Sequence, residues 1–146
     1  MEFHQLIVIN KMKDKTMKGY LIDPEQRRIT SVDVAEEWQA ITELIGARYF
    51  CVGSYLSNED TAYVDDEGLL NDGEKHWFKF KDTVVKTSNP NPLCGKCLVL
   101  GTDRSNGESI DVKLSFEELE NAVSWVADDQ VSDSQKNPTF EFLVFD

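Results

Sequence analysis

The sequence predicts a single α+β domain, with a mainly antiparallel sheet of about six to eight strands and two helices. Short apolar or alternating stretches follow one another with turn residues between them, and only two segments combine helical periodicity with capping residues. The chain has 146 residues, 40% of them hydrophobic, which suffices for one core. We expect the domain to span 1–146, with 1–16 as an N-terminal extension.

Strands are expected wherever β-branched or alternating apolar residues run between turn signals. Nine stretches fit this description, and we expect about six to eight of them in the sheet: residues 3–10, 18–23, 29–34, 48–56, 61–64, 76–80, 97–101, 109–113 and 139–145. The turn signal Asp23-Pro24 indicates that the second and third of these form a hairpin. The stretch 97–101 is almost continuously apolar, which is typical of an interior strand buried on both faces.

The first helix is expected over residues 35–45. Asp33 is a suitable N-cap, and Gly46 is a suitable C-terminal stop. Trp38 and Ile41 begin a series of apolar residues at three- and four-residue spacing, so we expect both on the buried face of this helix.

The second helix is expected over residues 115–127. Ser115 and Glu118 form the pattern of a capping box, in which the two side chains satisfy each other's free backbone N–H groups. The stretch 128–137 is polar, and we expect it to be a linker before a final strand.

The charge of the chain is acidic and uneven. Asp and Glu number 27 against 15 Lys and Arg, a net charge of −12. Residues 1–20 carry +2, so the remainder carries −14. Such a body repels phosphate backbones, and we expect no direct nucleic-acid binding. The charge favours solubility, docking on a basic partner, or mimicry of nucleic acid.

Neither a membrane span nor a signal peptide is expected. The apolar runs are only strand-sized, whereas a spanning helix needs about 20 residues. The N-terminus has no basic region ahead of its apolar run. We therefore expect a cytoplasmic protein without membrane association.

Cys94-Gly95-Lys96-Cys97 is the sharpest local motif. Two thiols at this spacing are typical of a redox pair or of half a zinc site. A zinc site needs two further ligands, and Cys51 and the two histidines are scattered along the chain. We expect Cys94 and Cys97 to be structural thiols, with the metal and redox alternatives open, and we predict no cofactor.

Several segments carry a family resemblance: 17–23 (MKGYLID), 63–70 (YVDDEGLL) and 92–103 (PLCGKCLVLGTD), followed by Gly107-Glu108-Ser109. They resemble a family of small proteins carried by phages, plasmids and bacterial mobile regions and catalogued only as a domain of unknown function. The resemblance covers about residues 17–126. It implies no reaction, but suggests a small acidic protein that acts on host machinery by binding.

The functional prediction is a non-enzymatic, acidic binding protein that docks on a host protein with a basic surface, such as a defence or nucleic-acid enzyme. The expected docking residues lie on the second helix and just after it: Glu117, Glu118, Glu120, Asp128 and Asp129. The alternative is a protein that sequesters a nucleotide-like ligand. Its expected pocket residues are Arg48, Trp77, Lys96 and Arg104. A third hypothesis is a metal- or thiol-dependent enzyme built on the two cysteines and the acidic stretch 65–67.

Overall fold

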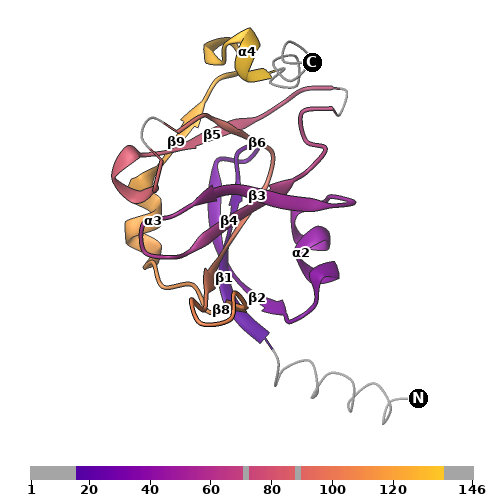
Figure 1. The fold of residues 1–146 in the computed structure, drawn as a ribbon. Helices are drawn as coiled ribbons and strands as arrows, with labels where there is room; N and C mark the ends of the chain where they lie inside the picture. The colour runs from indigo at the N-terminus through magenta and orange to yellow at the C-terminus, as the bar shows by residue number, and fades with distance from the viewer. Residues whose placement is uncertain (1–15, 71–72, 88–89, 137–146) are drawn as a thin grey trace, which may run out of the picture.

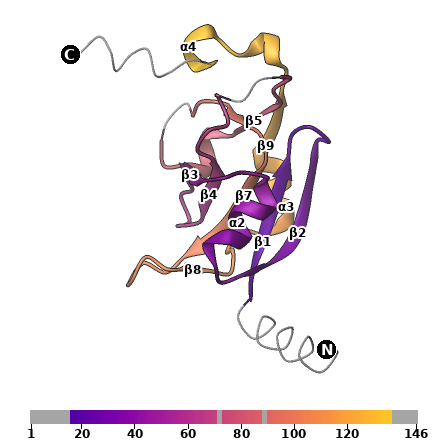
Figure 2. The same cartoon turned by 90° about the vertical axis from the view of Figure 1, so that its right-hand side faces the viewer.

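Strand β7 (Cys97–Thr102) is the centre of the larger sheet (Figures 1 and 2, with the label β7 in Figure 2). It pairs antiparallel with β1 (Thr16–Asp23) on one side and with β4 (Thr61–Asp65) on the other. All residues from Cys97 to Leu100 are fully buried. The prediction of an interior strand buried on both faces is confirmed.

The structure, a computed structural model, describes residues 16–70, 73–87 and 90–136. The expected strands 3–10 and 139–145 lie outside these residues, as does 1–15 of the expected N-terminal extension. Within the described residues the strands pair antiparallel in two sheets and the helices lie between or beside them. The predicted α+β class is confirmed.

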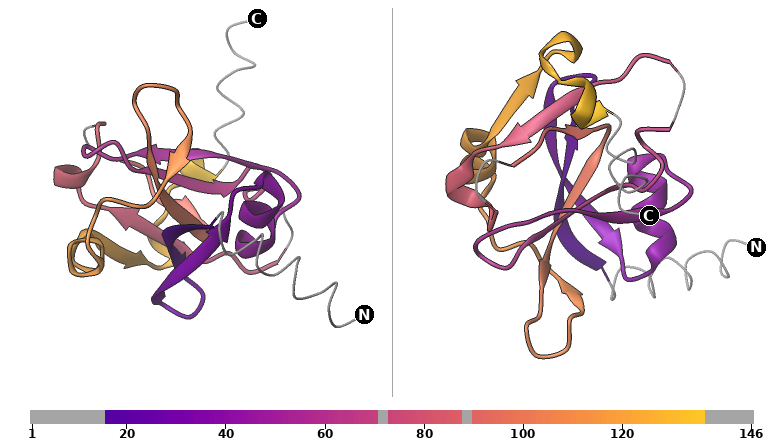
Figure 3. Two further views of the ribbon diagram at one scale, coloured as in Figure 1. Left: turned by 90° about the horizontal axis from the view of Figure 1, so that it is seen from below. Right: turned by 45° about the horizontal axis from the view of Figure 1, so that its top comes forward.

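The larger sheet has the strand order β2-β1-β7-β4-β3, with a short strand β8 (Ser109–Ile110) paired to the end of β7. Its edges are β2 (Arg28–Ala35) and β3 (Phe50–Tyr55). Strands β1 and β2 pair along their whole length, which confirms the predicted hairpin. The β7–β8 hairpin projects from the body of the molecule and is drawn in orange (Figures 2 and 3).

The smaller sheet consists of β6 (Leu93–Cys94), β5 (Trp77–Phe80) and β9 (Val123–Val126), in that order. The main core cluster joins Phe78 and Phe80 of this sheet to side chains of β1, β4 and β7. A second cluster lies on the other face of the larger sheet, under α2. Alternate residues of β7 enter each cluster, because neighbouring side chains of a strand point to opposite faces.

The first helix, α2 (Trp38–Ile45), begins later than predicted. Strand β2 continues to Ala35, because it pairs with β1 over that length, and Asp33 lies in this hairpin instead of capping the helix. Gly46 ends the helix as predicted, with a φ of 68° that glycine adopts without strain.

Trp38 was expected on the buried face of this helix, and this prediction is wrong: its side chain is 56% exposed. Ile41 and Ile45, on the later turns, are the residues of the helix that enter the core. Trp38 occupies the first helical position, ahead of the part of α2 that packs on the sheet.

The second helix, α3 (Phe116–Ala122), begins at the predicted capping box of Ser115 and Glu118, which is confirmed. It ends at Ala122 and not at residue 127. The next four residues form β9, because Val123, Trp125 and Val126 are β-branched or aromatic and pair with β5.

Short helical segments follow β9. The described part of the expected linker 128–137 contains a 3₁₀ turn, η2 (Asp128–Gln130), and one turn of helix, α4 (Asp133–Lys136). A further 3₁₀ turn, η1 (Asp82–Val84), follows β5. Lys136 Nζ of α4 donates a hydrogen bond of 3.0 Å to Asp128 Oδ2 of η2, and this bond connects α4 to η2.

Asp60, at the turn between β3 and β4, is a fully buried carboxylate. It accepts hydrogen bonds from the backbone N–H groups of Lys113 (3.0 Å) and Leu114 (2.9 Å), and from the side-chain amide of Asn58 (3.0 Å). These donors compensate the cost of removing the charge from water. Asp60 therefore connects the β3–β4 turn to the segment that enters α3, 53 positions later in the chain.

Asp60→Ala is expected to lower the free energy of unfolding by about 3 kcal/mol or more, because two buried backbone N–H groups lose their acceptor. Asn58→Ala removes one donor to the carboxylate and the side-chain acceptor of the Asp60 backbone N–H, but it leaves the carboxylate in place. We therefore expect a smaller loss of about 1–2 kcal/mol. Urea unfolding of both variants measures the difference. Equal and small losses for the two variants would show that Asp60 does not hold these segments together.

Candidate functional site

An open groove lies between the start of β1, the first turn of α2 and strand β8. We call it the acidic groove. Its volume is about 480 Å³, and its lining residues are Met17, Glu36, Glu37, Trp38, Ile41, Phe50, Glu108 and Ser109. Met17 and Ile41 are buried, so they form its apolar floor. The groove thus combines an apolar floor, an exposed indole and three carboxylates.

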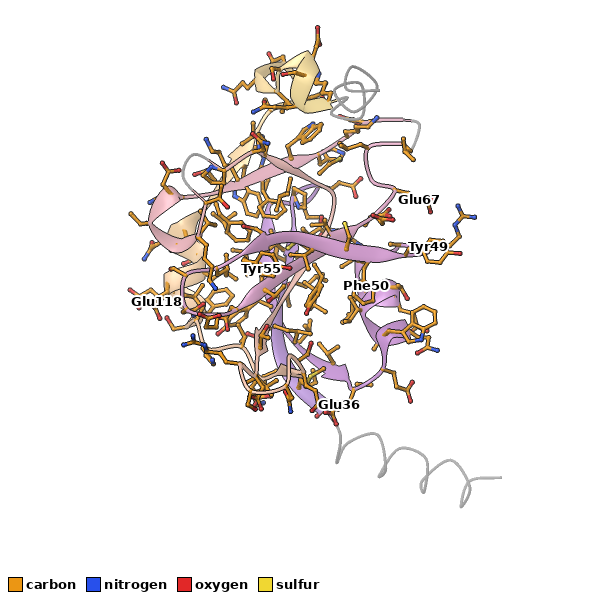
Figure 4. All side chains as sticks on the ribbon, in the orientation of Figure 1. Glu36, Tyr49, Phe50, Tyr55, Glu67 and Glu118 are labelled. Atoms are coloured by element: carbon orange, nitrogen blue, oxygen red, sulfur yellow. The ribbon has the colours of Figure 1, made fainter. Side chains whose placement is uncertain are left out.

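The three carboxylates come from two distant parts of the chain. Glu36 and Glu37 precede α2, and Glu108 precedes β8. Within the described residues none of the three has an ion pair or a side-chain hydrogen bond, and no lysine or arginine lines the groove. Figure 4 shows Glu36 at the lower end of the molecule, away from Glu118 at its left edge.

A second cleft lies where β3, β6 and α4 approach one another. We call it the Cys94 cleft. Its volume is about 410 Å³, and Cys51, Leu70, Trp77, Leu93 and Cys94 are among its lining residues. A smaller hollow of about 240 Å³, lined in part by His76 and Lys96, shares Asp65, Gly68 and Cys94 with it. The lining of the Cys94 cleft is mainly apolar and includes the charged residues Asp65, Asp66 and Lys136.

The four residues expected in a ligand pocket do not come together. Trp77 lines the Cys94 cleft, and Lys96 lines the smaller hollow beside it. Arg48 is exposed, and one of its guanidinium nitrogens donates hydrogen bonds to both carboxylate oxygens of Glu67, at 2.8 and 3.1 Å. Hydrogen bonding to Glu67 raises the pKa of Arg48. Arg104 lines neither of these two hollows; its Nε lies 4.0 Å from Glu59 Oε1.

Trp77 is not an open stacking platform, because it is almost completely buried. Its indole N–H donates a hydrogen bond of 2.8 Å to Asp128, which lies in η2. This bond, and a second from Lys136, lower the pKa of the Asp128 carboxyl. Asp128, expected as a docking residue, therefore anchors η2 and α4 over the smaller sheet.

The remaining expected docking residues differ in whether their side chains already have partners within the described residues. Glu118 accepts a hydrogen bond from the backbone N–H of Ser115, which lowers its pKa. Glu117, Glu120 and Asp129 are exposed, and their side chains have no ion pair or hydrogen bond within the described residues. These three are available to a partner.

The two cysteines of the Cys-Gly-Lys-Cys motif belong to different sheets. Cys94 lies in β6 and is half-buried, whereas Cys97 lies in β7, fully buried between Ile22 and Val64 of the neighbouring strands. Burial raises the pKa of both thiols. Searched over 16–70, 73–87 and 90–136, the structure contains no group of three potential metal ligands.

Glu36, Glu37, Trp38 and Glu108 were not expected at a site. The adjacent Glu-Glu-Trp at 36–38 is a visible signal, but the spacing of Trp38 to Ile41 fits a buried helix face equally well. Glu108 joins this group only through the β7–β8 hairpin, which a sequence pattern does not place.

In the described part of the chain no helix is both long and apolar enough to cross a membrane. The described residues form a small α+β domain with open hollows on its surface. The model of one family, described as Domain of unknown function (DUF3846), matches residues 17–123. The chain belongs to this family. Searches of the curated proteins and of the solved structures found no match.

The three thiols are expected to differ in their reaction with iodoacetamide at pH 8. Burial and a hydrogen bond with Asp66 raise the pKa of Cys51 to about 11, so its labelling should be roughly a hundredfold slower than in urea-unfolded protein. Cys97 should remain unlabelled until the protein unfolds. Peptide mass spectrometry over time measures all three rates.

Asp66→Asn removes the carboxylate beside Cys51 and is expected to accelerate the labelling of Cys51.

The raised pKa of the Cys51 thiol also makes the free energy of unfolding depend on pH. It falls as the pH rises from the ordinary thiol pKa towards 11, because the thiol of the unfolded chain loses its proton first. Labelling of Cys97 in the folded protein at the rate of Cys51 would contradict the burial described above.

Proposed function

We propose that this protein is a non-enzymatic binding protein of a phage, prophage or plasmid. In this proposal it works in the cytoplasm and docks through its acidic surface on a host protein with a basic surface, such as a defence or nucleic-acid enzyme. Neither nucleic acid nor a membrane is its target, and it needs no cofactor.

The observation that carries this proposal is the set of exposed carboxylates without partners among the described residues. Six of them lie in two groups: Glu36, Glu37 and Glu108 at the acidic groove, and Glu117, Glu120 and Asp129 on α3 and η2. Crowded like charges repel one another and destabilise the compact state. A basic partner relieves this repulsion, and attraction between opposite surfaces accelerates association.

A second candidate function is the binding of a small nucleotide-like ligand in the Cys94 cleft. Its volume of about 410 Å³ and its mainly apolar lining support this candidate. Its lining includes charged side chains of both signs, among them Asp65, Asp66 and Lys136. Mass spectrometry of small molecules extracted from the purified protein tests it, because a tightly held ligand copurifies.

The docking proposal predicts the outcome of a capture experiment with a bacterial host lysate. Immobilised wild-type protein should retain one or a few basic proteins and release them at about 1 M salt, where the Debye length falls to about 3 Å. A neutralised variant carries amides at the six carboxylates named above and should retain none of these proteins. Melting curves of both proteins provide the control for folding.

Retention of the same proteins by both forms would show that docking does not depend on these charges. Retention that survives high salt would contradict electrostatic docking in the same way.

A further inference from the structure

We propose that the acidic groove is the docking site itself, and that its occupant is an extended segment of the partner bearing arginine or lysine. This inference rests on the proposed function and names the surface and the partner chemistry. It assigns the contact to α2 and β8 and not to α3, where the sequence placed it.

The groove is surrounded by negative charge. Glu36 and Glu37 line it from the residues just before α2, and Glu108 lines it from the β7–β8 hairpin. With no lysine or arginine among the described lining residues, nothing there offsets these charges. The helix N-terminus beside Trp38 supplies only a partial positive charge. The groove therefore attracts cations.

An exposed indole lines the groove together with these carboxylates. Trp38 is 56% exposed, although an apolar ring of this size is normally buried. Arginine and lysine side chains bind the faces of aromatic rings, and tryptophan is the best of these rings. An indole beside three carboxylates thus offers a cationic side chain both stacking and charge pairing.

The size of the groove fits a peptide segment better than a single cationic group. A groove of about 480 Å³ is larger than one ammonium or guanidinium group, and its floor is apolar. Phe50, whose ring meets that of Tyr63 at a centroid distance of 5.4 Å, forms a rigid part of the lining. An extended peptide covers such a floor with its backbone and aliphatic stems while its cationic ends reach the rim.

The surface of α3 is a weaker candidate for the same partner. Glu118 is held by the capping box. Phe116 packs edge-on against Tyr20 at a centroid distance of 5.9 Å and is 38% exposed, less than Trp38. Its free carboxylates lie on a helix face without an exposed indole. This surface provides the matched control, because the same number of charges can be removed there.

The test uses a fluorescein-labelled octa-arginine peptide and fluorescence anisotropy at 50 mM salt. The groove variant is E36Q/E37Q/E108Q, and the control variant is E117Q/E120Q/D129N, with an identical change of net charge. We expect the groove variant to lose about tenfold in affinity and the control variant less than about twofold. Trp38→Ala should lose about threefold, with partial recovery in Trp38→Phe.

Equal losses in the two triple variants would overturn the inference, because net charge alone would then explain binding; the proposed function would stand. Absence of peptide binding by the wild-type protein would also overturn it, and the lysate capture then decides the proposed function separately. Tighter binding by K11Q/K13Q/K15Q would overturn the assignment to a partner, because the chain's own lysines would then be the occupant.

Discussion

The buried carboxylate of Asp60 is the constraint on which the arrangement of the described residues depends. By accepting hydrogen bonds from the backbone at 113–114, it fixes the segment between β8 and α3 against the β3–β4 turn. Asp111, at the other end of this segment, accepts a bond of 2.8 Å from the backbone N–H of Lys18. The segment is therefore anchored at both ends. This anchoring places the β7–β8 hairpin beside β1, and with it Glu108 at the acidic groove.

The groove differs from the places where carboxylates are satisfied within the molecule. Glu67 is bound by Arg48, Glu118 by its capping box and Asp128 by Trp77. At the groove, carboxylates and a large aromatic ring face solvent together. Such exposed combinations reduce the stability of the isolated protein and become favourable when a complementary surface covers them. For the same physical reason the groove is a better candidate than the surface of α3, which has no exposed indole.

Much of the fold could be predicted from local patterns, whereas features that depend on distant contacts could not. The apolar run of β7 and the capping box of α3 are local and were correctly predicted. The end of α3 was not, because residues 123–126 form a strand only when β5 is available as a partner. The predicted burial of Trp38 was wrong for a related reason. Periodicity indicates which face of a helix is buried, but not how much of the helix length packs on the sheet. The burial of Asp60 depends on donors 53 positions away, which no local pattern shows.

The central claim is that a basic segment binds between α2 and β8. The most direct measurement is a titration of ¹⁵N-labelled protein with octa-arginine peptide, followed by two-dimensional NMR. The account predicts shift changes concentrated at residues 36–41 and 108–109, with the Trp38 indole resonance among the largest. Shift changes concentrated on α3, or around the Cys94 cleft, would contradict it.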